Sequence, residues 1–231
     1  NLDHRELSHR LSRYGLNPCH SADTLVSTDR GLIPIAELVD QNFQALVDLR
    51  SVSLDGVRLT KAIAFPTGVQ TTYQVTLSNG LRMRCTADHE HFTNDGWVAT
   101  KNLTPQHKIF IQKGQGQFGQ GTISPEQAQM LGWLYGDGSI YRGSRNSLEA
   151  VFYINQKEYS RTFPVLASAV QSLTGYQHQP SVVKGMYTFH SGSAKMSQFL
   201  EGLGVVSKEF LPTNFLTQSK EVVIGFLQGL F

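Results

Sequence analysis

The hydrophobic period changes once along this chain, and this change constrains the fold more than any other sequence feature. Over roughly the first hundred residues, apolar and polar side chains alternate, most clearly in Thr72–Leu77 and in Leu81–Cys85. A period of two is typical of β-strands. From Ser124 onward, apolar side chains recur at helical spacing in several segments. We therefore predict a β-rich domain followed by an α+β domain.

Turn and helix-start residues predict the individual elements. Asp55-Gly56 indicates a hairpin between the alternating runs Val47–Leu54 and Val57–Phe65. Ser124-Pro125 supplies an N-cap and a first helical residue for a helix that ends at Gly136-Asp137-Gly138. The remaining predicted elements are a strand at 148–154, a helix at 159–173, a hairpin at 179–190, and helices at 194–203 and 219–231. The Gly- and Gln-rich stretch 114–121 reads as a flexible connector, and we place the domain boundary there.

Composition excludes several classes of protein. The chain has 231 residues, of which 40% are hydrophobic and 16% charged, as in soluble globular proteins. No apolar run approaches the roughly 18 residues that span a membrane. The formal net charge of +2 does not by itself indicate a nucleic-acid partner. The two cysteines, Cys19 and Cys85, favour reduced thiols in a cytosolic protein, so we expect a cytoplasmic protein with no membrane partner.

Two segments of the first domain carry residues suited to acyl chemistry. Cys19 follows Asn17-Pro18 and precedes a short strand; such a cysteine is often a buried small hydrophobe, whereas a nucleophile needs a base and access. Thr86 and His89 lie three residues apart after a hairpin. There, a hydroxyl and an imidazole can hydrogen-bond one peptide and protonate its leaving amide. The alternative, a metal site at His89 and His91, lacks Cys or carboxylate partners at metal spacing.

The third chemically informative segment is Met130–Ser139. Gly132 and Gly136 lie four residues apart and allow a second helix backbone to approach closely, and Asp137 follows at the helix end. A buried helix with a capping Asp-Gly turn fits these residues equally well. The segment 224–231 repeats the glycine spacing at Gly225 and Gly229, as expected for the second helix of such a pair.

These residues carry a family resemblance. Cys19–Gly31 resembles the amino-terminal splicing block of an intein, and Thr86–Thr93, with Gly96-Trp97 after it, resembles the Thr-x-x-His block of that family. Met130–Ser139 resembles the first LAGLIDADG motif of a homing endonuclease, and 225–231 the start of the second. Ser207–Pro212 is similar to the lysine-containing segment between the two motifs. These blocks stand in the family's order along the sequence and cover nearly the whole chain.

The resemblance implies a splicing role for the first domain, with a β-rich horseshoe (Hint-like) fold. Cys19 would be the first intein residue, and its thiol would attack the carbonyl of Pro18 in an N-to-S acyl shift. Thr86 and His89 would hold and activate the Pro18–Cys19 splice junction, with His89 as acid and base. Splicing would need no cofactor.

The resemblance implies DNA cleavage for the second domain. Asp137 would bind a divalent cation, expected to be Mg²⁺ because this hard cation prefers carboxylate and phosphate oxygens. Lys208 would stabilise charge at the scissile phosphate. Double-stranded DNA would lie on strands at about 139–154 and 179–190. The expected contacts are Tyr141, Arg142, Arg145, Tyr153, Lys184 and Tyr187.

The family pattern is incomplete here, because the His-Asn splicing end and the second catalytic carboxylate are absent from this sequence. We expect a truncated precursor or a natural split half that needs the missing C-terminal intein segment. The predicted organisation is a flanking N-extein tail (1–18), the first part of the splicing domain (19–113), the linker (114–121) and an incomplete endonuclease domain (122–231). Tyr14–Pro18 followed by Cys resembles the active-site loop of a ribonucleotide reductase large subunit as host.

Two other functions compete with this interpretation. One is a DNA-binding or endonuclease module whose β-rich domain no longer splices. The other is an autoprocessing domain of hedgehog type, which also uses a cysteine together with a Thr-x-x-His segment. The endonuclease-like segment that begins at Met130 argues against the second alternative.

Overall fold

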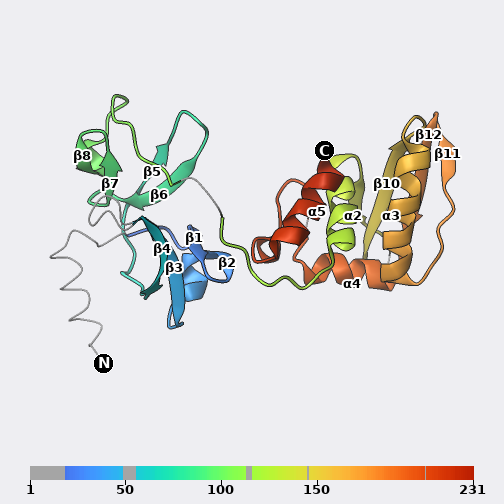
Figure 1. The fold of residues 1–231 in the computed structure, drawn as a ribbon, viewed down its shortest axis with the longest axis horizontal. Helices are drawn as coiled ribbons and strands as arrows, with labels where there is room; N and C mark the ends of the chain where they lie inside the picture. The colour runs from blue at the N-terminus through green and yellow to red at the C-terminus, as the bar shows by residue number, and fades with distance from the viewer. Residues whose placement is uncertain (1–18, 49–55, 113–115, 145, 206) are drawn as a thin grey trace. The chain divides into compact units, whose positions relative to one another are not determined.

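The computed structural model describes residues 19–48, 56–112, 116–144, 146–205 and 207–231. The chain forms two compact units that divide between Gln117 and Phe118 (Figure 1). Unit 1 is β-rich and unit 2 combines helices with one sheet. The predicted fold class, a β-rich domain followed by an α+β domain, is confirmed. The predicted host tail at 1–18, including Pro18, lies outside the described residues.

Unit 1 consists of short strands in one four-stranded and two two-stranded antiparallel sheets. Strand order in the larger sheet is β2-β1-β3-β4, and the smaller sheets are β5-β6 and β7-β8. The elements are β1 (Leu25–Thr28), β2 (Gly31–Pro34), η1 (Ile35–Leu38), β3 (Phe43–Asp48), β4 (Val57–Ala62), β5 (Thr72–Thr76), β6 (Arg82–Thr86), β7 (Glu90–Thr93), β8 (Gly96–Ala99) and η2 (Thr100–Asn102). A small core of Ile33, Leu38, Phe43 and Ala64 lies beneath the larger sheet and η1.

The predicted hairpins of unit 1 are present, with one shift in position. β5 and β6 pair as expected, and Asn79 Oδ1 accepts a hydrogen bond from the Leu81 amide within their turn. β3 and β4 also pair antiparallel. However, β3 begins at Phe43, four residues before the predicted start at Val47, because the Phe43 side chain is buried in the core. The turn residues 49–55 lie outside the described part of the chain.

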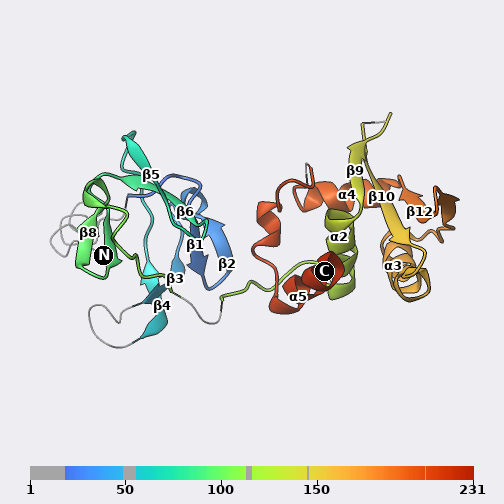
Figure 2. The same cartoon turned by 90° about the horizontal axis from the view of Figure 1, so that it is seen from above.

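Unit 2 is an antiparallel sheet of order β11-β12-β10-β9 with helices on one face (Figure 2). Its elements are α2 (Pro125–Gly136), β9 (Ser139–Arg142), β10 (Leu148–Asn155), α3 (Tyr159–Thr174), β11 (Ser181–Val183), β12 (Met186–Ser191), α4 (Ala194–Gly202), η3 (Thr213–Phe215) and α5 (Lys220–Leu230). Every second side chain of β10 is buried, at Leu148, Ala150, Phe152 and Ile154, and contributes to a core shared with the helices. The intervening side chains lie on the helix-free face, which we call the open face.

Helices α2 and α5 pack closely along their glycines. A Cβ on Gly132 would lie 2.1 Å from Phe226 O, and a Cβ on Gly229 would lie 2.0 Å from Gln129 O. Real Cβ atoms do not approach other atoms so closely, so only glycine fits at either position. The predicted glycine seam is therefore present in unit 2.

The seam has an internal two-fold relation. Gly132 meets Phe226 O and Leu230 N, while Gly229 meets Gln129 O and Trp133 N. The residue numbers of equivalent positions differ by 97. The equivalent pairs are Gly132 and Gly229, Gln129 and Phe226, and Trp133 and Leu230. The two helices therefore occupy equivalent positions across their contact.

The connector 114–121 is not free along its whole length. The Gly119 amide donates to Gln218 O at 3.0 Å, and the Thr122 amide donates to Gln218 Oε1 at 2.8 Å. Gln218 itself is buried. The second half of the connector is thus hydrogen-bonded to unit 2 through Gln218, and flexibility of the connector stays a prediction. Within the described residues, no helix is long and apolar enough to cross a membrane.

We predict that Gly132→Ala destabilises unit 2 by about 3 kcal/mol, because the added Cβ forces the α2 and α5 backbones apart. Gly202→Ala in α4 is the matched control, since its Cβ would meet nothing within 4 Å. The control is expected to be neutral or stabilising by about 0.5–1 kcal/mol. Denaturant unfolding measures both variants. Equal stability of the Gly132 variant and the wild type would contradict the close packing of the seam.

Candidate functional site

Residues 19–21 pair with β6 and bring Cys19 beside Thr86. The Thr86 amide donates to Cys19 O at 3.1 Å, the Ser21 amide donates to Arg84 O at 3.1 Å, and His20 opposes Cys85 between these two bonds. In an antiparallel pair, opposing residues share a face and successive residues alternate between faces. Cys19 and Thr86 therefore lie on one face, and His20 and Cys85 lie on the other. The structure thus brings together two residues that sequence analysis singled out 67 positions apart.

Cys19 is buried beside an apolar cavity of about 370 Å³. The other lining residues come from the segments 20–22, 35–39 and 64–68. The thiol is free in this structure, as is that of Cys85.

His89 lies in a row of three imidazole rings. Its ring centroid is 4.4 Å from that of His20 and 4.8 Å from that of His91, and both contacts are edge-on. Burial, followed by repulsion from His20 and His91, lowers the pKa of His89 to about 4. Burial also lowers the pKa values of His20 and His91. His89 is therefore neutral at pH 7 and can accept or donate a proton in turn.

Thr100 fixes the main chain of His89. The carbonyl of His89 accepts hydrogen bonds from the Thr100 amide at 2.8 Å and from Thr100 Oγ1 at 3.0 Å. Because this hydroxyl donates to His89, it accepts from His91 Nε2, which lies 2.9 Å away. Cys85 Sγ lies 3.3 Å from the same oxygen. The buried group of Cys85, His91 and Thr100 therefore holds His89 in place.

Three buried polar side-chain atoms near Cys19 have no hydrogen-bond partner among the described residues. They are His20 Nδ1, Thr86 Oγ1 and His89 Nδ1. The Thr86 hydroxyl lowers the pKa of the exposed Asp88 carboxylate, but the two groups do not reach hydrogen-bonding geometry. Because buried polar atoms are normally satisfied, these three are available to bond a further polar group.

Sequence analysis missed His20 and Thr100. His20 comes directly after the candidate nucleophile Cys19 in the sequence, and this adjacency was the available signal. Thr100 has no local signal, because its role depends on the return of the chain through β7 and β8 to His89.

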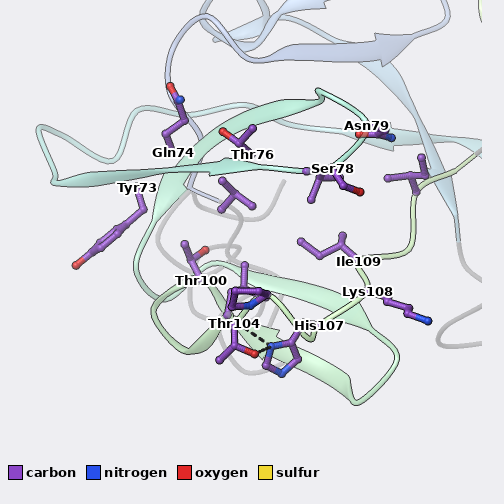
Figure 3. Close-up of a pocket in the computed structure, with 15 residues that line it drawn as sticks. Tyr73, Gln74, Thr76, Ser78, Asn79, Thr100, Thr104, His107, Lys108 and Ile109 are labelled. Atoms are coloured by element: carbon purple, nitrogen blue, oxygen red, sulfur yellow. Dashed lines mark hydrogen bonds between the residues drawn. The ribbon is translucent and has the colours of Figure 1, made fainter.

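A second cavity of unit 1, of about 790 Å³, lies beside β5 (Figure 3). Strand β5 contributes Tyr73, Gln74 and Thr76, and the facing loop contributes Thr104 and Ile109. Within the described residues, β5 pairs only with β6, so its other edge is unpaired. Figure 3 shows the cavity between the β5–β6 hairpin and the loop that carries His107 and Lys108.

In unit 2, Asp137 lies exposed at the carboxyl end of α2, where it is the C-cap residue. It lines a cleft of about 540 Å³ with Trp133 and Arg161. It also lines an adjoining cleft of about 480 Å³ with Tyr153 and Lys157. No described residue pairs with the Lys157 ammonium, which sequence analysis did not single out. Asp137 thus faces a space that continues toward the open face of the sheet.

Lys208 reaches the same helix end but is already bonded there. Its Nζ donates to Gly136 O at 3.1 Å and to Gly138 O at 2.8 Å. Lys208 and Asp137 therefore lie at the same end of α2, where the ammonium contacts main-chain carbonyls. The predicted role of Lys208 at the scissile phosphate stays a prediction.

The predicted DNA contacts divide between the two faces of the sheet. Tyr141 and Tyr153 lie on the open face, and Lys184 lies exposed in the β11–β12 turn. Arg142 instead pairs with Glu201 of α4. Tyr187 stacks on Tyr159 of α3 at 3.8 Å, so it faces the helices. Arg145 lies outside the described residues.

One cluster on the open face joins Tyr141 to a carboxylate. Tyr141 Oη lies 2.9 Å from His190 Nε2, which lies 2.7 Å from Glu149 Oε2. Burial raises the pKa of Tyr141, and Glu149 raises it further. These side chains are thus held in place before any ligand arrives.

Asp137 can supply one protein ligand of a Mg²⁺ site. Among the described residues, no group of three or more His, Cys, Asp or Glu side chains could hold a metal ion. Mg²⁺, however, keeps several waters and takes one or two carboxylates together with substrate phosphates. The exposed carboxylate of Asp137 supplies one such ligand, so the residues present fit a shared site.

Sequence comparison finds relatives named replicative DNA helicase DnaB. The protein from Nostoc sp. (strain PCC 7120) is 27% identical over 92% of this chain and 25% of its own length. The protein from Rhodothermus marinus is 31% identical over 56% of this chain and 14% of its own length. The chain therefore spans about a quarter or less of these relatives. No protein-family model matches the sequence.

Two groups of solved structures are similar to parts of this chain. A DnaB intein from Synechocystis sp. PCC 6803 is 24% identical, with a TM-score of 0.37, over 40% of this chain and 67% of its own. The endonuclease I-DmoI in complex with DNA and Ca is 18% identical, with a TM-score of 0.34, over 46% of this chain and 55% of its own.

We predict that unit 1 loses stability as the pH falls from about 6.5 to about 4. Unfolded histidine binds a proton near pH 6.5, whereas folded His89 binds one only near pH 4. Between these values the unfolded state binds more protons, so the free energy of unfolding decreases as the pH falls. His89→Gln is expected to reduce this dependence. Equal stability of unit 1 at pH 4.5 and pH 6.5 would contradict the neutral, buried row of histidines.

Proposed function

We propose that unit 1 is the N-terminal part of a self-splicing intein that starts splicing by an N-to-S acyl shift at Cys19. The observation that carries this proposal is the pairing of Cys19 with Thr86, which joins the thiol residue to a Thr-x-x-His segment. The unsatisfied Thr86 Oγ1 and His89 Nδ1 support it, because a peptide bond offers both a carbonyl acceptor and an amide donor.

The proposed step exchanges a peptide bond for a thioester. Cys19 Sγ forms a bond to the carbonyl carbon of Pro18, and the bond between that carbon and the Cys19 nitrogen breaks. The thiol proton ends on the freed amine. Neutral His89 is suited to carry this proton, since it can accept it and then donate it. Thr86 Oγ1 is suited to hydrogen-bond the junction and polarise it.

Completion of splicing requires a further segment that carries the His-Asn end. The unpaired edge of β5 and the cavity beside it suit an extended peptide, because an added strand pairs with free main-chain groups and fills neighbouring pockets. We propose that the C-terminal intein segment pairs there, either in cis or in trans.

We propose that unit 2 is the first part of a LAGLIDADG homing endonuclease for double-stranded DNA. Its support is the glycine seam, with Asp137 at the end of one seam helix. When bound, Mg²⁺ would polarise the scissile phosphate and activate water. Asp137 would hold it, and Lys157 would meet the phosphate backbone, because it lines the same cleft and has no partner among the described residues.

The two-fold relation of the seam supports a proposal for the position of the second carboxylate. An offset of 97 relates α2 to α5, so the position opposite Asp137 is the third after Phe231. We propose an acidic residue at that position in a longer form of this protein. DNA would lie on the open face, where Tyr141 and Tyr153 offer base contacts and Lys184 a phosphate contact.

The second candidate function is a DNA-binding endonuclease module whose β-rich domain no longer splices. The buried state of Cys19 favours this second function, because a nucleophilic thiol needs access. The ribonucleotide reductase host remains a prediction from Tyr14–Pro18, which lie outside the described residues. Cytoplasmic localisation also remains a prediction.

We predict ligation of the flanking extein segments when the missing C-terminal intein segment is supplied. Cys19→Ala should abolish ligation, because no other group can form the thioester at this junction. Lys61→Ala, at an exposed position of β4, is the control and should leave ligation unchanged. Mass spectrometry of the products measures both variants. Ligation that persists in the Cys19 variant would exclude the splicing proposal.

We predict that the completed endonuclease cuts duplex DNA only with a divalent cation, and that Asp137→Asn removes cutting while binding is retained. The amide keeps the shape of the side chain but ligates Mg²⁺ poorly. Gel assays of cleavage and binding on one target separate the two effects. Cleavage by the Asn variant at the wild-type rate would rule out Asp137 as a metal ligand.

A further inference from the structure

Four hydrogen bonds join the end of α2 to the segment 207–210 in a reciprocal arrangement. Lys208 Nζ donates to the carbonyls of Gly136 and Gly138, the two residues that flank Asp137. Tyr135 Oη lies within hydrogen-bond distance of the carbonyls of Ser207 and Phe210, at 3.3 Å and 3.0 Å. Each segment therefore holds the main chain around the charged residue of the other.

The donors of Lys208 are largely committed by this arrangement. An ammonium has three N–H donors, and two of them are used on carbonyls at the carboxyl end of α2. This end carries the negative pole of the helix dipole, which a lysine stabilises. A lysine side chain that is bonded in this way is poorly placed to contact a phosphate as well.

The bonds act on the direction of the Asp137 side chain. Asp137 has already left helical geometry, with φ −105° and ψ 3°, and its amide donates to Trp133 O at 3.0 Å. The Gly136 carbonyl belongs to the peptide plane directly before the Asp137 Cα, and the Gly138 carbonyl belongs to the plane one residue beyond it. The two bonds therefore restrain the main chain that sets the Cα–Cβ direction of Asp137. The carboxylate is thereby aimed into the cleft that it shares with Trp133.

We propose that Lys208 is a positioning residue that orients the Asp137 carboxylate for a divalent cation, and that Tyr135 supports it by holding the segment 207–210. This inference rests on the proposed function of unit 2. It replaces the expectation that Lys208 itself stabilises the scissile phosphate, and it leaves Lys157 and Arg161, which line the clefts beside Asp137, as cations available for that phosphate.

The two roles of Lys208 predict opposite effects on cation affinity. If the Lys208 ammonium only stabilises a phosphate, its positive charge repels the metal ion, so removal of this charge should tighten cation binding. A group that orients a ligand should weaken binding when removed, by about 10-fold as for other outer partners of metal ligands. The sign of the change therefore separates the two roles without any measurement of activity.

The test uses Tb³⁺, a hard cation, with the chain of residues 1–231. Trp133 shares the cleft with Asp137 and sensitises Tb³⁺ emission there. Titration of the wild type gives the Kd, and loss of emission in Asp137→Asn assigns the site. We expect Lys208→Met to raise the Kd about 10-fold. We expect Lys208→Arg to restore binding largely, because guanidinium also donates to carbonyls.

Two further variants guard against a general loss of structure. Tyr135→Phe removes only the hydroxyl and keeps the ring contact with Phe226, so it should raise the Kd less than Lys208→Met does. Lys195→Met, on the exposed face of α4, should leave the Kd unchanged. Circular dichroism melting checks that each variant folds.

Each outcome has a distinct meaning. An unchanged or lower Kd in folded Lys208→Met overturns the positioning role and leaves the proposed endonuclease intact. Absence of Tb³⁺ emission in the wild type, or emission that Asp137→Asn retains, removes the proposed cation site itself and overturns this inference with it.

Discussion

The pairing of residues 19–21 with β6 is the interaction on which the candidate site of unit 1 depends. Two main-chain hydrogen bonds place Cys19 on the same face as Thr86 and put His20 and Cys85 on the other. The second face then becomes a buried polar layer, in which Thr100 fixes His89 and three rings remain neutral. One face thus carries Cys19 and the unsatisfied Thr86 hydroxyl, and the other carries the neutral imidazoles; a nucleophile, a polarising hydroxyl and a neutral base are the kinds of group that an acyl shift uses.

Unit 2 depends in a similar way on backbone contact. The seam of α2 and α5 exists because glycines let carbonyl oxygens approach the facing helix. This packing brings the end of α2 to the segment 207–210, where Lys208 and Tyr135 fix the chain around Asp137. In both units, hydrogen bonds to the main chain between segments distant in sequence hold the residue proposed to react; the donors are main-chain amides in unit 1 and side chains in unit 2.

Much of the fold was predictable because its signals are local. The N-cap Ser124 forms a capping box with Gln127, and α3 and α5 lie within two residues of their predicted bounds. The site was predictable only in part. Cys19, Thr86 and His89 have recognisable spacing, whereas Thr100 acts through tertiary contacts that no spacing reveals. The predicted contact Tyr187 lies on the helix side, because one aromatic residue in a strand does not indicate which face it occupies.

The central claim is that Cys19 exchanges the Pro18–Cys19 peptide bond for a thioester. Incubation of the chain with dithiothreitol, followed by mass spectrometry, tests it most directly, because an external thiol cleaves a thioester and leaves a peptide bond intact. The account predicts release of residues 1–18 from the wild type and no release from Cys19→Ala. An intact wild-type chain after long incubation, or equal release from both proteins, would contradict it.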